Sequence, residues 1–271
     1  MYLMKKVFSI FMMALIPVTI FLLTSCSETI DSKYLKIGVD DSYPPMEYKD
    51  EKSNTIGFDI DVAKEIARRL GKEPQFVSTA WDGIFSALNT RKFDCIISSM
   101  SMTAKRLEEF TFTKPYIATS QMIIVNPNVN SITKPEDLAG KKVGCQVSTT
   151  AHEAAIKIQA KGTKFAELKI YDQVIQPFAD MKAGRLDAII VDEVVGLYYI
   201  GLDKANFKSA SAKLTNEPIG VCLKKGNKIL ADKIQKAIDA MVADGKMKQI
   251  SLQWFNADLT SNIDTVLKEM N

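Results

Sequence analysis

Histidine is almost missing from this chain of 271 residues, which contains only one, His152. A single imidazole without clustered cysteine or carboxylate partners supports neither a metal site nor a catalytic triad that depends on histidine. His152 stands among Thr149, Thr150 and Glu153, where a helix is expected to begin, so we interpret it as a solvent-facing helical side chain. The sequence therefore predicts neither a metal nor a cofactor.

Cysteine is scarce as well, with four in the chain. Cys26 belongs to the N-terminal segment, whereas Cys95, Cys145 and Cys222 each lie in apolar, strand-like sequence. Three is an odd number, so at least one of these thiols is unpaired, and their spacing is not that of a zinc site. We expect small buried hydrophobic side chains, and a single disulfide remains an alternative.

The chain also lacks an excess of charge of one sign. It has 35 lysines and arginines against 32 aspartates and glutamates, which gives a net charge of +3. Without Lys5 and Lys6 of the N-terminal segment the count is 33 against 32, because 35 − 2 = 33. Such a balance provides no strongly positive surface, so no nucleic-acid partner is expected. The length, with 46% hydrophobic residues, suffices for one large domain or two lobes.

The N-terminal 26 residues have the three zones of a secretion signal. Lys5 and Lys6 precede an apolar run over residues 7–23, and small residues follow before Cys26. The sequence LTSC at this point resembles the lipobox that lipoprotein signal peptidase cuts. An uncleaved membrane anchor is the alternative, and both interpretations place the globular part outside the cytoplasm.

We therefore predict a lipoprotein signal peptide over residues 1–25 and a lipid tether over residues 26–32. Cys26 would be the first mature residue, would carry lipid such as palmitate, and would hold the protein at the membrane. The expected location is the periplasm or the outer face of the cell membrane.

After the tether, short apolar stretches alternate with amphipathic ones, as is typical of an α/β fold. The clearest helix prediction has Asp59 as its cap, an apolar stripe from Ile60 to Leu70, and Gly71 as its stop. Strands are expected at 35–39, 75–77, 95–98, 121–125, 142–146, 167–171, 187–191 and 219–223, and helices start near 84, 151 and 178 and span 229–242 and 247–255.

Short motifs follow one another in a fixed order over nearly all of residues 35–255. The most specific is SSMSMTAKR at 98–106, followed by FTKPY at 112–116. The others are KIGVDDSYPPME at 36–47, GFDID at 57–61, WDGI at 81–84, GCQVSTT at 144–150, GRLDA at 184–188 and the pair Asp192-Glu193. Through this series the chain resembles the solute-binding proteins for polar amino acids, bacterial extracellular family 3.

The resemblance implies a type II periplasmic-binding-protein fold, the Venus-flytrap arrangement of two α/β lobes joined by two crossover hinge segments. In such proteins the lobes close over a ligand in the cleft between them. The first lobe would contain residues 33–118 and 216–271, and the second lobe residues 119–215. A monomer that delivers its ligand to an ABC transporter permease is expected.

An α-amino acid carries a carboxylate and an ammonium on one carbon, so its receptor needs groups of both charges. Arg106 matches the family's carboxylate clamp, and a guanidinium can hold a carboxylate through two parallel bonds. Asp192, between a predicted strand and helix, matches the group that binds the ammonium. The alternatives are a solvated helix charge for Arg106 and a helix N-cap without a ligand for Asp192. The same resemblance adds Ser98, Ser99, Ser101 and Thr149 as ligand-binding residues.

Selectivity for the side chain is expected from Asp40, Tyr43 and Trp81, which match positions in the family's side-chain pocket. Two aromatic rings can enclose an aliphatic or cationic chain, and Asp40 can pair with a distal positive group, which favours arginine, lysine or histidine. As alternatives, Asp40 holds its own loop through Asx-type bonds, and the two rings belong to the core. Glutamine-binding relatives also carry an aspartate near this point.

Other classes of protein share this fold. Some periplasmic cyclohexadienyl dehydratases resemble these binding proteins and need a general acid near the leaving hydroxyl, for which Glu47 or Glu193 is a candidate. The combination of Arg106 with Asp192 instead suits a free amino acid that undergoes no chemistry. We therefore predict an amino-acid-binding protein and not an enzyme; a ligand-sensing lipoprotein is a further alternative.

Overall fold

The computed structural model describes residues 32–210, 213–261 and 263. The predicted signal peptide, Cys26 and all of the predicted tether except Ser32 lie outside the described residues. The described residues from Lys33 onward form one compact α/β unit. Among the described residues, no helix has both the length and the apolar character needed to cross a membrane.

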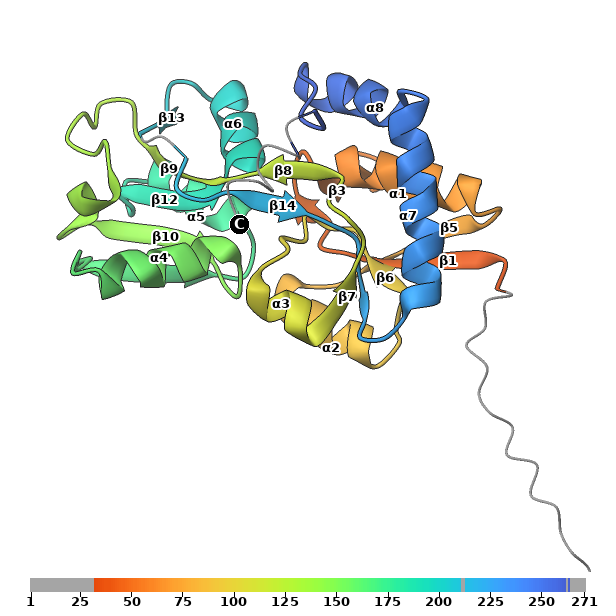
Figure 1. Cartoon of the computed structure of the whole chain (residues 1–271). Helices are drawn as coiled ribbons and strands as arrows, with labels where there is room; N and C mark the ends of the chain where they lie inside the picture. The colour runs from red at the N-terminus through yellow and green to blue at the C-terminus, as the bar shows by residue number, and fades with distance from the viewer. Residues whose placement is uncertain (1–31, 211–212, 262, 264–271) are drawn as a thin grey trace, which may run out of the picture. The chain divides into compact units, whose positions relative to one another are not determined.

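The first of two five-stranded sheets combines strands from both halves of the chain (Figure 1). In spatial order its strands are β5 (Glu73–Ser78), β1 (Tyr34–Val39), β6 (Cys95–Ile96), β15 (Cys222–Lys224) and β7 (Phe110–Phe112). β1 is parallel to β5 and β6, whereas β15 runs antiparallel to β6 and β7. We call this sheet and the helices that pack on it the first lobe.

The second sheet uses a continuous stretch of the chain. Its order is β11 (Glu167–Tyr171), β10 (Lys142–Gln146), β12 (Ala188–Asp192), β9 (Gln121–Val125) and β13 (Lys208–Ser209). β10 is parallel to β11 and β12, and β9 runs antiparallel to β12. We call this sheet and its helices the second lobe.

Two crossover strands join the lobes and pair with each other. β8 (Ile117–Thr119) carries the chain from the first lobe to the second, and β14 (Glu217–Ile219) brings it back. They are antiparallel, with Glu217 opposite Thr119, and lie side by side in Figure 1. The predicted two-lobed fold with two crossover segments is therefore confirmed. The predicted lobe boundaries, at 118/119 and 215/216, fall inside β8 and just before β14 and stay a prediction.

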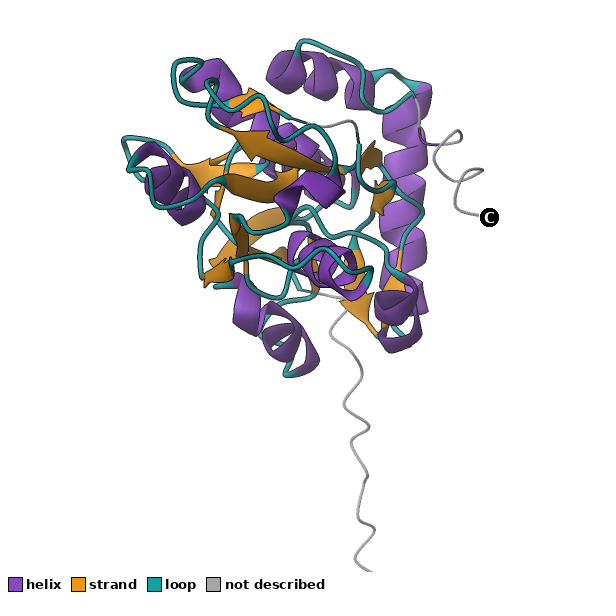
Figure 2. Cartoon of the chain, turned by 90° about the vertical axis from the view of Figure 1, so that its left-hand side faces the viewer, coloured by secondary structure: helices purple, strands orange, loops and turns teal. Residues whose placement is uncertain are grey.

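Helices cover the sheets, and Figure 2 shows them surrounding the strands. The C-terminal helices α7 and α8 pack against each other and against α1, which places the end of the described chain on the first lobe. The first lobe has α1 (Phe58–Arg69), α2 (Ile84–Asn89), α3 (Ala104–Glu109), α7 (Lys228–Ala243) and α8 (Lys246–Phe255); the second has α4 (Thr150–Ala160), α5 (Ile175–Lys182) and α6 (Glu193–Leu202).

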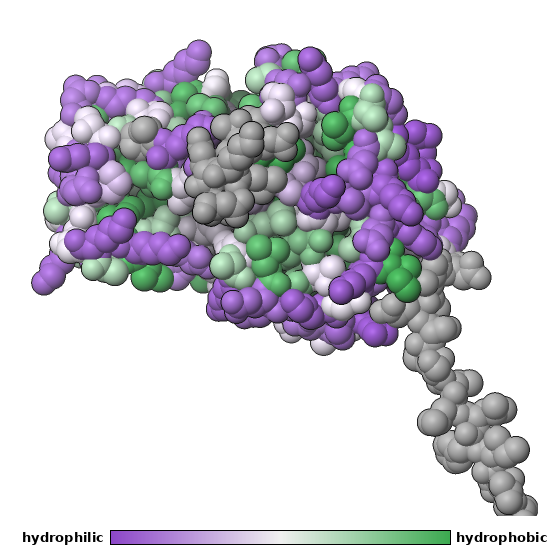
Figure 3. Space-filling model, in the orientation of Figure 1, coloured by the Kyte–Doolittle hydropathy of each residue, from purple (hydrophilic) through white to green (hydrophobic). Residues whose placement is uncertain are grey.

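Smaller elements complete the described fold. On the face drawn in Figure 3, hydrophilic residues dominate the visible surface and hydrophobic ones are interspersed.

His152 lies in the first turn of α4 and is half-buried, so it is less exposed than predicted. The minor elements are the sheet of β2 (Ser42–Tyr43), β3 (Glu47–Lys49) and β4 (Thr55–Ile56), and the 3-10 helices η1 (Trp81–Gly83) and η2 (Pro135–Leu138).

The three cysteines within the described chain are buried and unpaired. Cys95 and Cys222 lie on neighbouring strands of the first sheet, and Cys145 lies on β10. Burial raises the pKa of each thiol above its ordinary value, which opposes formation of the reactive thiolate. The expectation of small buried hydrophobic side chains is confirmed, and the alternative of a disulfide among them is wrong.

The start of α1 differs from its prediction. Gly57, not Asp59, occupies the N-cap position, no side chain caps the helix, and Asp59 is a fully buried residue of the first turn. At the other end Gly71 has a φ of +66°, so the predicted glycine stop is confirmed. The error arose because an aspartate before an apolar stripe is as suitable for a cap as for a buried anchor.

Gly57 is expected to tolerate no side chain. Its φ is +139°, and a Cβ built there would lie 2.1 Å from the carbonyl oxygen of Met46. Backbone strain and overpacking together should make Gly57→Ala lower the free energy of unfolding by about 2–5 kcal/mol, measured by urea denaturation. The matched control is Gly83→Ala, where φ is −97° and no atom lies within 4 Å of the new Cβ. Equal losses in the two variants would contradict this explanation.

Candidate functional site

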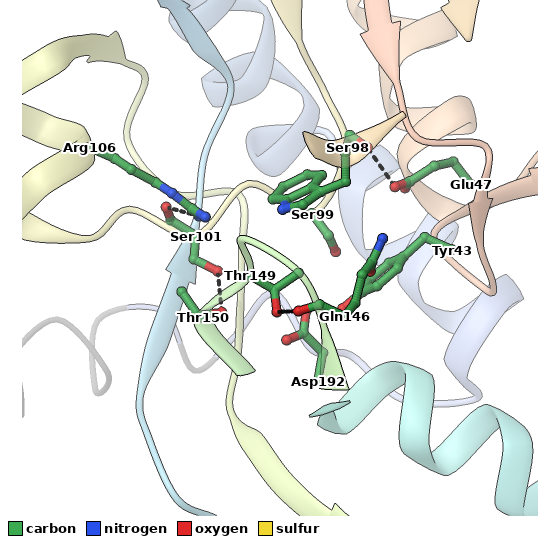
Figure 4. Close-up of a pocket in the computed structure, with 11 residues that line it drawn as sticks. Tyr43, Glu47, Ser98, Ser99, Ser101, Arg106, Gln146, Thr149, Thr150 and Asp192 are labelled. Carbon is green, nitrogen blue, oxygen red and sulfur yellow. Dashed lines mark hydrogen bonds between the residues drawn. The ribbon is translucent and has the colours of Figure 1, made fainter. Parts of the chain in front are cut away.

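A cavity lies where side chains of the two lobes meet, and Figure 4 shows the residues around it. Together with the space that opens to solvent, it holds about 290 Å³ that no atom occupies. The first lobe contributes Tyr43, Glu47, Trp81, Ser98, Ser99, Ser101 and Arg106 to its lining, and the second lobe contributes Gln146, Thr149, Thr150 and Asp192. Eight of the nine predicted ligand-binding residues are in this set, and Asp40 is not.

Arg106 is held as a buried cation. Thr103 caps α3 by accepting a hydrogen bond from the Arg106 backbone nitrogen. The guanidinium donates to the carbonyl oxygens of Ser101 (3.1 Å) and Ser148 (3.5 Å). Its Cζ lies 5.6 Å from the ring centre of Trp81 and 5.3 Å from that of Phe85. The protein therefore fixes the guanidinium with neutral groups and aromatic faces.

No carboxylate within the described chain forms an ion pair with Arg106. The residue is only 7% exposed, so the alternative of a solvated helix charge is wrong. Burial lowers the pKa of the guanidinium, with only partial compensation from more distant acidic groups. A buried cation without a counter-ion is costly, and an anion in the cavity would relieve that cost.

Asp192 is the corresponding buried anion from the second lobe. It ends β12 and occupies the N-cap position of α6, yet its side chain makes no capping bond. Oδ1 instead accepts a short hydrogen bond from Nε2 of Gln121. Burial and, next, the charge of Glu217 raise the pKa of Asp192 to about 7. A positive group beside Asp192 would favour its ionised form.

The backbone of Ser99, in the motif at 98–106, is held by a buried carboxylate. Ser99 has a φ of +45°, and its backbone nitrogen donates to Oδ2 of Asp59 at 2.6 Å. The hydroxyl of Tyr116 donates to the other oxygen of Asp59 at 2.9 Å. Asp59, fully buried, thus holds Ser99 in a left-handed conformation that a serine rarely adopts on its own.

Glu47 supports the neighbouring serine. Its Oε1 accepts from the Ser98 hydroxyl at 2.6 Å, and the Ser98 oxygen accepts from the backbone nitrogen of Asp40 at 3.0 Å. Burial, and then the adjacent charge of Asp59, hold the pKa of Glu47 well above its usual range. Of this carboxyl pair, Glu47 is therefore the member that burial and the charge of Asp59 favour in its neutral form.

Asp40 lies behind the cavity wall. Oδ1 accepts from the Ser42 hydroxyl at 2.7 Å, and Oδ2 accepts from Nε2 of Gln146 at 3.0 Å. Asp40 thus makes the local loop bond that was its alternative role and also reaches across to the second lobe. Gln146, which the sequence did not single out, separates Asp40 from the cavity, and the buried Oε1 of Gln146 has no partner among the described residues. A ligand role for Asp40 stays a prediction.

The predicted aromatic pair and threonine line the cavity. Trp81 is 8% exposed, and its indole nitrogen donates to the carbonyl oxygen of Ser148 at 3.0 Å, which links the lobes. Tyr43 is 9% exposed. Thr149 caps α4, accepts from the His152 backbone nitrogen at 3.2 Å, and donates to the Gln146 carbonyl oxygen at 2.7 Å. Trp81 and Tyr43 also belong to buried apolar clusters, so cavity lining and core packing coexist.

Several residues of the site were missed from the sequence. Gln146 and Thr150 lie inside a recognised motif, and their places at a strand end and a helix start could have indicated them. Gln121, a polar residue that opens an otherwise apolar strand, gave a weaker signal. Glu217 gave none. Among the described residues there is no cluster of histidine, cysteine or acidic side chains that suits a metal.

A cavity lined by two lobes that share two crossover strands defines the class of the protein, a two-lobed solute-binding protein. The family follows from comparison with known sequences. The model of the bacterial extracellular solute-binding proteins, family 3, matches residues 35–257, and the chain belongs to this family. The resemblance drawn from the motifs is confirmed.

Individual relatives agree with this membership. L-cystine-binding protein TcyJ of Escherichia coli (strain K12) is 29% identical over 227 residues, which cover 83% of this chain and 84% of that protein. ABC transporter arginine-binding protein 1 of the same strain is 32% identical over 225 residues, covering 82% and 90%. The solved structure of the ancestral amino acid-binding protein AncCDT-1, a precursor of cyclohexadienyl dehydratase, has a TM-score of 0.77 and 33% identity, covering 82% and 96%.

Proposed function

We propose that this protein captures a free L-amino acid outside the cytoplasm. One observation carries the proposal: Arg106 and Asp192, of opposite charge, line the same buried cavity, and neither forms an ion pair within the described chain. A zwitterion supplies the counter-charge for both. Since the two residues come from different lobes, the ligand would favour the closed arrangement.

The side chain of the ligand is proposed to be polar, with a cationic group favoured. Gln146 lines the cavity with a buried carbonyl oxygen that has no partner among the described residues, and the carboxylate of Asp40 lies directly behind it. These are acceptors, which suits a side chain with several N–H donors. The relative named for arginine supports this choice, whereas the relative named for L-cystine keeps a neutral ligand as the competing candidate.

Delivery to the permease of an ABC transporter completes the proposal, supported by the arginine-binding relative, whose name places it in such a transporter. We propose further that residues 1–25 are a lipoprotein signal peptide, that lipid on Cys26 holds the protein at the membrane, and that it works as a monomer. We propose no catalysis, because Arg106 and Asp192 match an unreacted amino acid. The relation of AncCDT-1 to a dehydratase keeps enzyme activity as an outcome to be tested.

Titration of the soluble protein, starting at Ser27, against the standard amino acids plus ornithine, citrulline and cystine tests the proposal. A ligand that binds only the folded protein raises the melting temperature. At a ligand concentration of a hundred times Kd, the free energy of unfolding increases by about 2.7 kcal/mol. We expect arginine to raise it more than citrulline, a neutral molecule of nearly the same shape. Thermal shift and calorimetry provide the measurement.

The outcomes separate the parts of the proposal. A larger shift with cystine than with arginine would reject the cationic side chain and keep amino-acid capture. No shift with any amino acid would reject amino-acid capture, and turnover of prephenate by the same sample would establish the enzyme interpretation instead.

A further inference from the structure

Glu217 is a buried carboxylate on β14, one of the two crossover strands, and it lies behind the cavity wall. It is 6% exposed. Its Oε2 accepts from the hydroxyls of Ser101 and Thr150, both at 2.8 Å, and from Nε2 of Gln121 at 3.2 Å. Oε1 accepts from the Thr215 hydroxyl at 2.8 Å. The groups around it thus come from both lobes, and Thr215 lies two residues before Glu217.

These contacts leave Glu217 as an acceptor only. The amide nitrogen of Gln121 can only donate, and no lysine or arginine of the described chain forms an ion pair with Glu217. Four neutral donors on two carboxylate oxygens are what a buried carboxylate requires in place of water.

The contact fixes the direction of the Ser101 hydroxyl. A serine hydroxyl has one proton and two lone pairs, and Ser101 donates its proton in the hydrogen bond to Glu217. Ser101 also lines the cavity, so the side that it presents there is an acceptor. The second hydroxyl on Glu217, that of Thr150, has one of its two lone pairs taken by Nε2 of Gln121 at 3.1 Å, so Ser101 offers a ligand the greater free acceptor capacity.

The same network extends to the proposed ammonium site. Nε2 of Gln121 donates to both Asp192 and Glu217, so the two buried carboxylates share one amide between them. Asp192 supplies negative charge and Ser101 supplies a neutral acceptor. A group with several N–H donors and a positive charge, the α-ammonium of an amino acid, satisfies both.

We propose that Glu217 is a positioning residue that selects an α-ammonium over an α-hydroxyl by holding the Ser101 hydroxyl as an acceptor. This inference rests on the proposed capture of an amino acid. It assigns the discrimination between an amine and a hydroxyl to a side chain on the crossover strand, which itself does not line the cavity.

Glu217→Gln tests the inference with almost no change in shape. The new amide has one acceptor oxygen and no negative charge, so it holds the proton of Ser101 less firmly than the carboxylate does and lets that proton point into the cavity. The probes are the amino acid with the largest thermal shift in the wild type and the 2-hydroxy acid with the same side chain, for arginine L-argininic acid. We expect Kd for the amino acid to rise at least tenfold and Kd for the hydroxy acid to change less than threefold, measured by calorimetry and by displacement.

Two further variants separate positioning from general damage. Thr215→Val removes the donor on the other oxygen of Glu217. The ratio of the Kd for the hydroxy acid to the Kd for the amino acid should then stay within threefold of the wild type. Ser101→Ala removes the oriented hydroxyl, should lower the same ratio, and should make Glu217→Gln almost without further effect in the double variant.

The outcomes are distinct from those of the function test. Absence of amino-acid binding by the wild type would reject the proposed function. If the wild type binds the amino acid and Glu217→Gln loses affinity equally for the amino acid and the hydroxy acid, only the positioning role is overturned. If Glu217→Gln does not fold, an unchanged amine-to-hydroxyl ratio in Ser101→Ala would overturn it equally.

Discussion

Arg106→Ala is expected to weaken binding of the amino acid about 30-fold to several thousandfold. Removing one partner of a buried, hydrogen-bonded charge pair typically costs about 2–5 kcal/mol, and each 1.4 kcal/mol is about tenfold in Kd. Arg106 contributes its charge and its remaining N–H donors to the same cavity, so both are lost together. Calorimetric titration at constant pH and salt measures the change.

Two further substitutions sharpen this experiment. Arg106→Lys keeps the charge but loses the planar fork and the contact of the guanidinium with the rings of Trp81 and Phe85, so its affinity should fall between those of the wild type and the alanine variant. Arg68→Ala removes an exposed arginine that is paired with Glu65 and should change Kd less than threefold. Wild-type affinity in Arg106→Ala would show that the carboxylate binds elsewhere.

Asp192→Asn is expected to abolish tight binding and also the dependence of binding on pH. The pKa of Asp192 is raised from 3.8 to about 7, mainly by burial and then by Glu217, while Gln121, Tyr43 and Arg106 act in the opposite direction. In the empty protein this carboxyl therefore stabilises the fold at low pH, and the effect is lost as pH rises through about 7. An ammonium needs the ionised form, so affinity should rise as pH increases toward 7.

Proton release measures this effect directly. At pH 6 binding should release nearly one proton from the wild type, and at pH 8.5 almost none, as determined by calorimetry in buffers of different ionisation enthalpy. Asp192→Asn should show a loss of about 2–5 kcal/mol in binding and no proton release at either pH. The control is Glu193→Gln, next in sequence but paired with Lys213, which should retain both affinity and proton release. Equal proton release at the two pH values would refute the assignment.

The fold was predictable because its strands and helices repeat simple patterns. The run at 167–171, for example, was predicted as a strand and is β11. Arg106 was predictable because it lies in the motif at 98–106, which carries the resemblance to the family. In both cases the signal lies within a few consecutive residues.

The parts that were missed depend on contacts between distant segments. Asp59 bonds to Ser99 across 40 positions, and Glu217 meets Ser101 across 116, so neither partner can be found from local spacing. Asp40 was expected in the cavity because of its motif, but Gln146 from the other lobe lies between, and only tertiary structure shows that.

The interruption of the first lobe by the second has a consequence for how the chain matures. β15 is hydrogen-bonded between β6 and β7, so the first sheet stays open until residue 224 has been made and delivered. The second sheet, built entirely from residues between 121 and 209, needs nothing that follows it. During synthesis and passage through a membrane, the second lobe can therefore complete its hydrogen bonds first. The first lobe meanwhile leaves the edges of β6 and β7 without their partner strand.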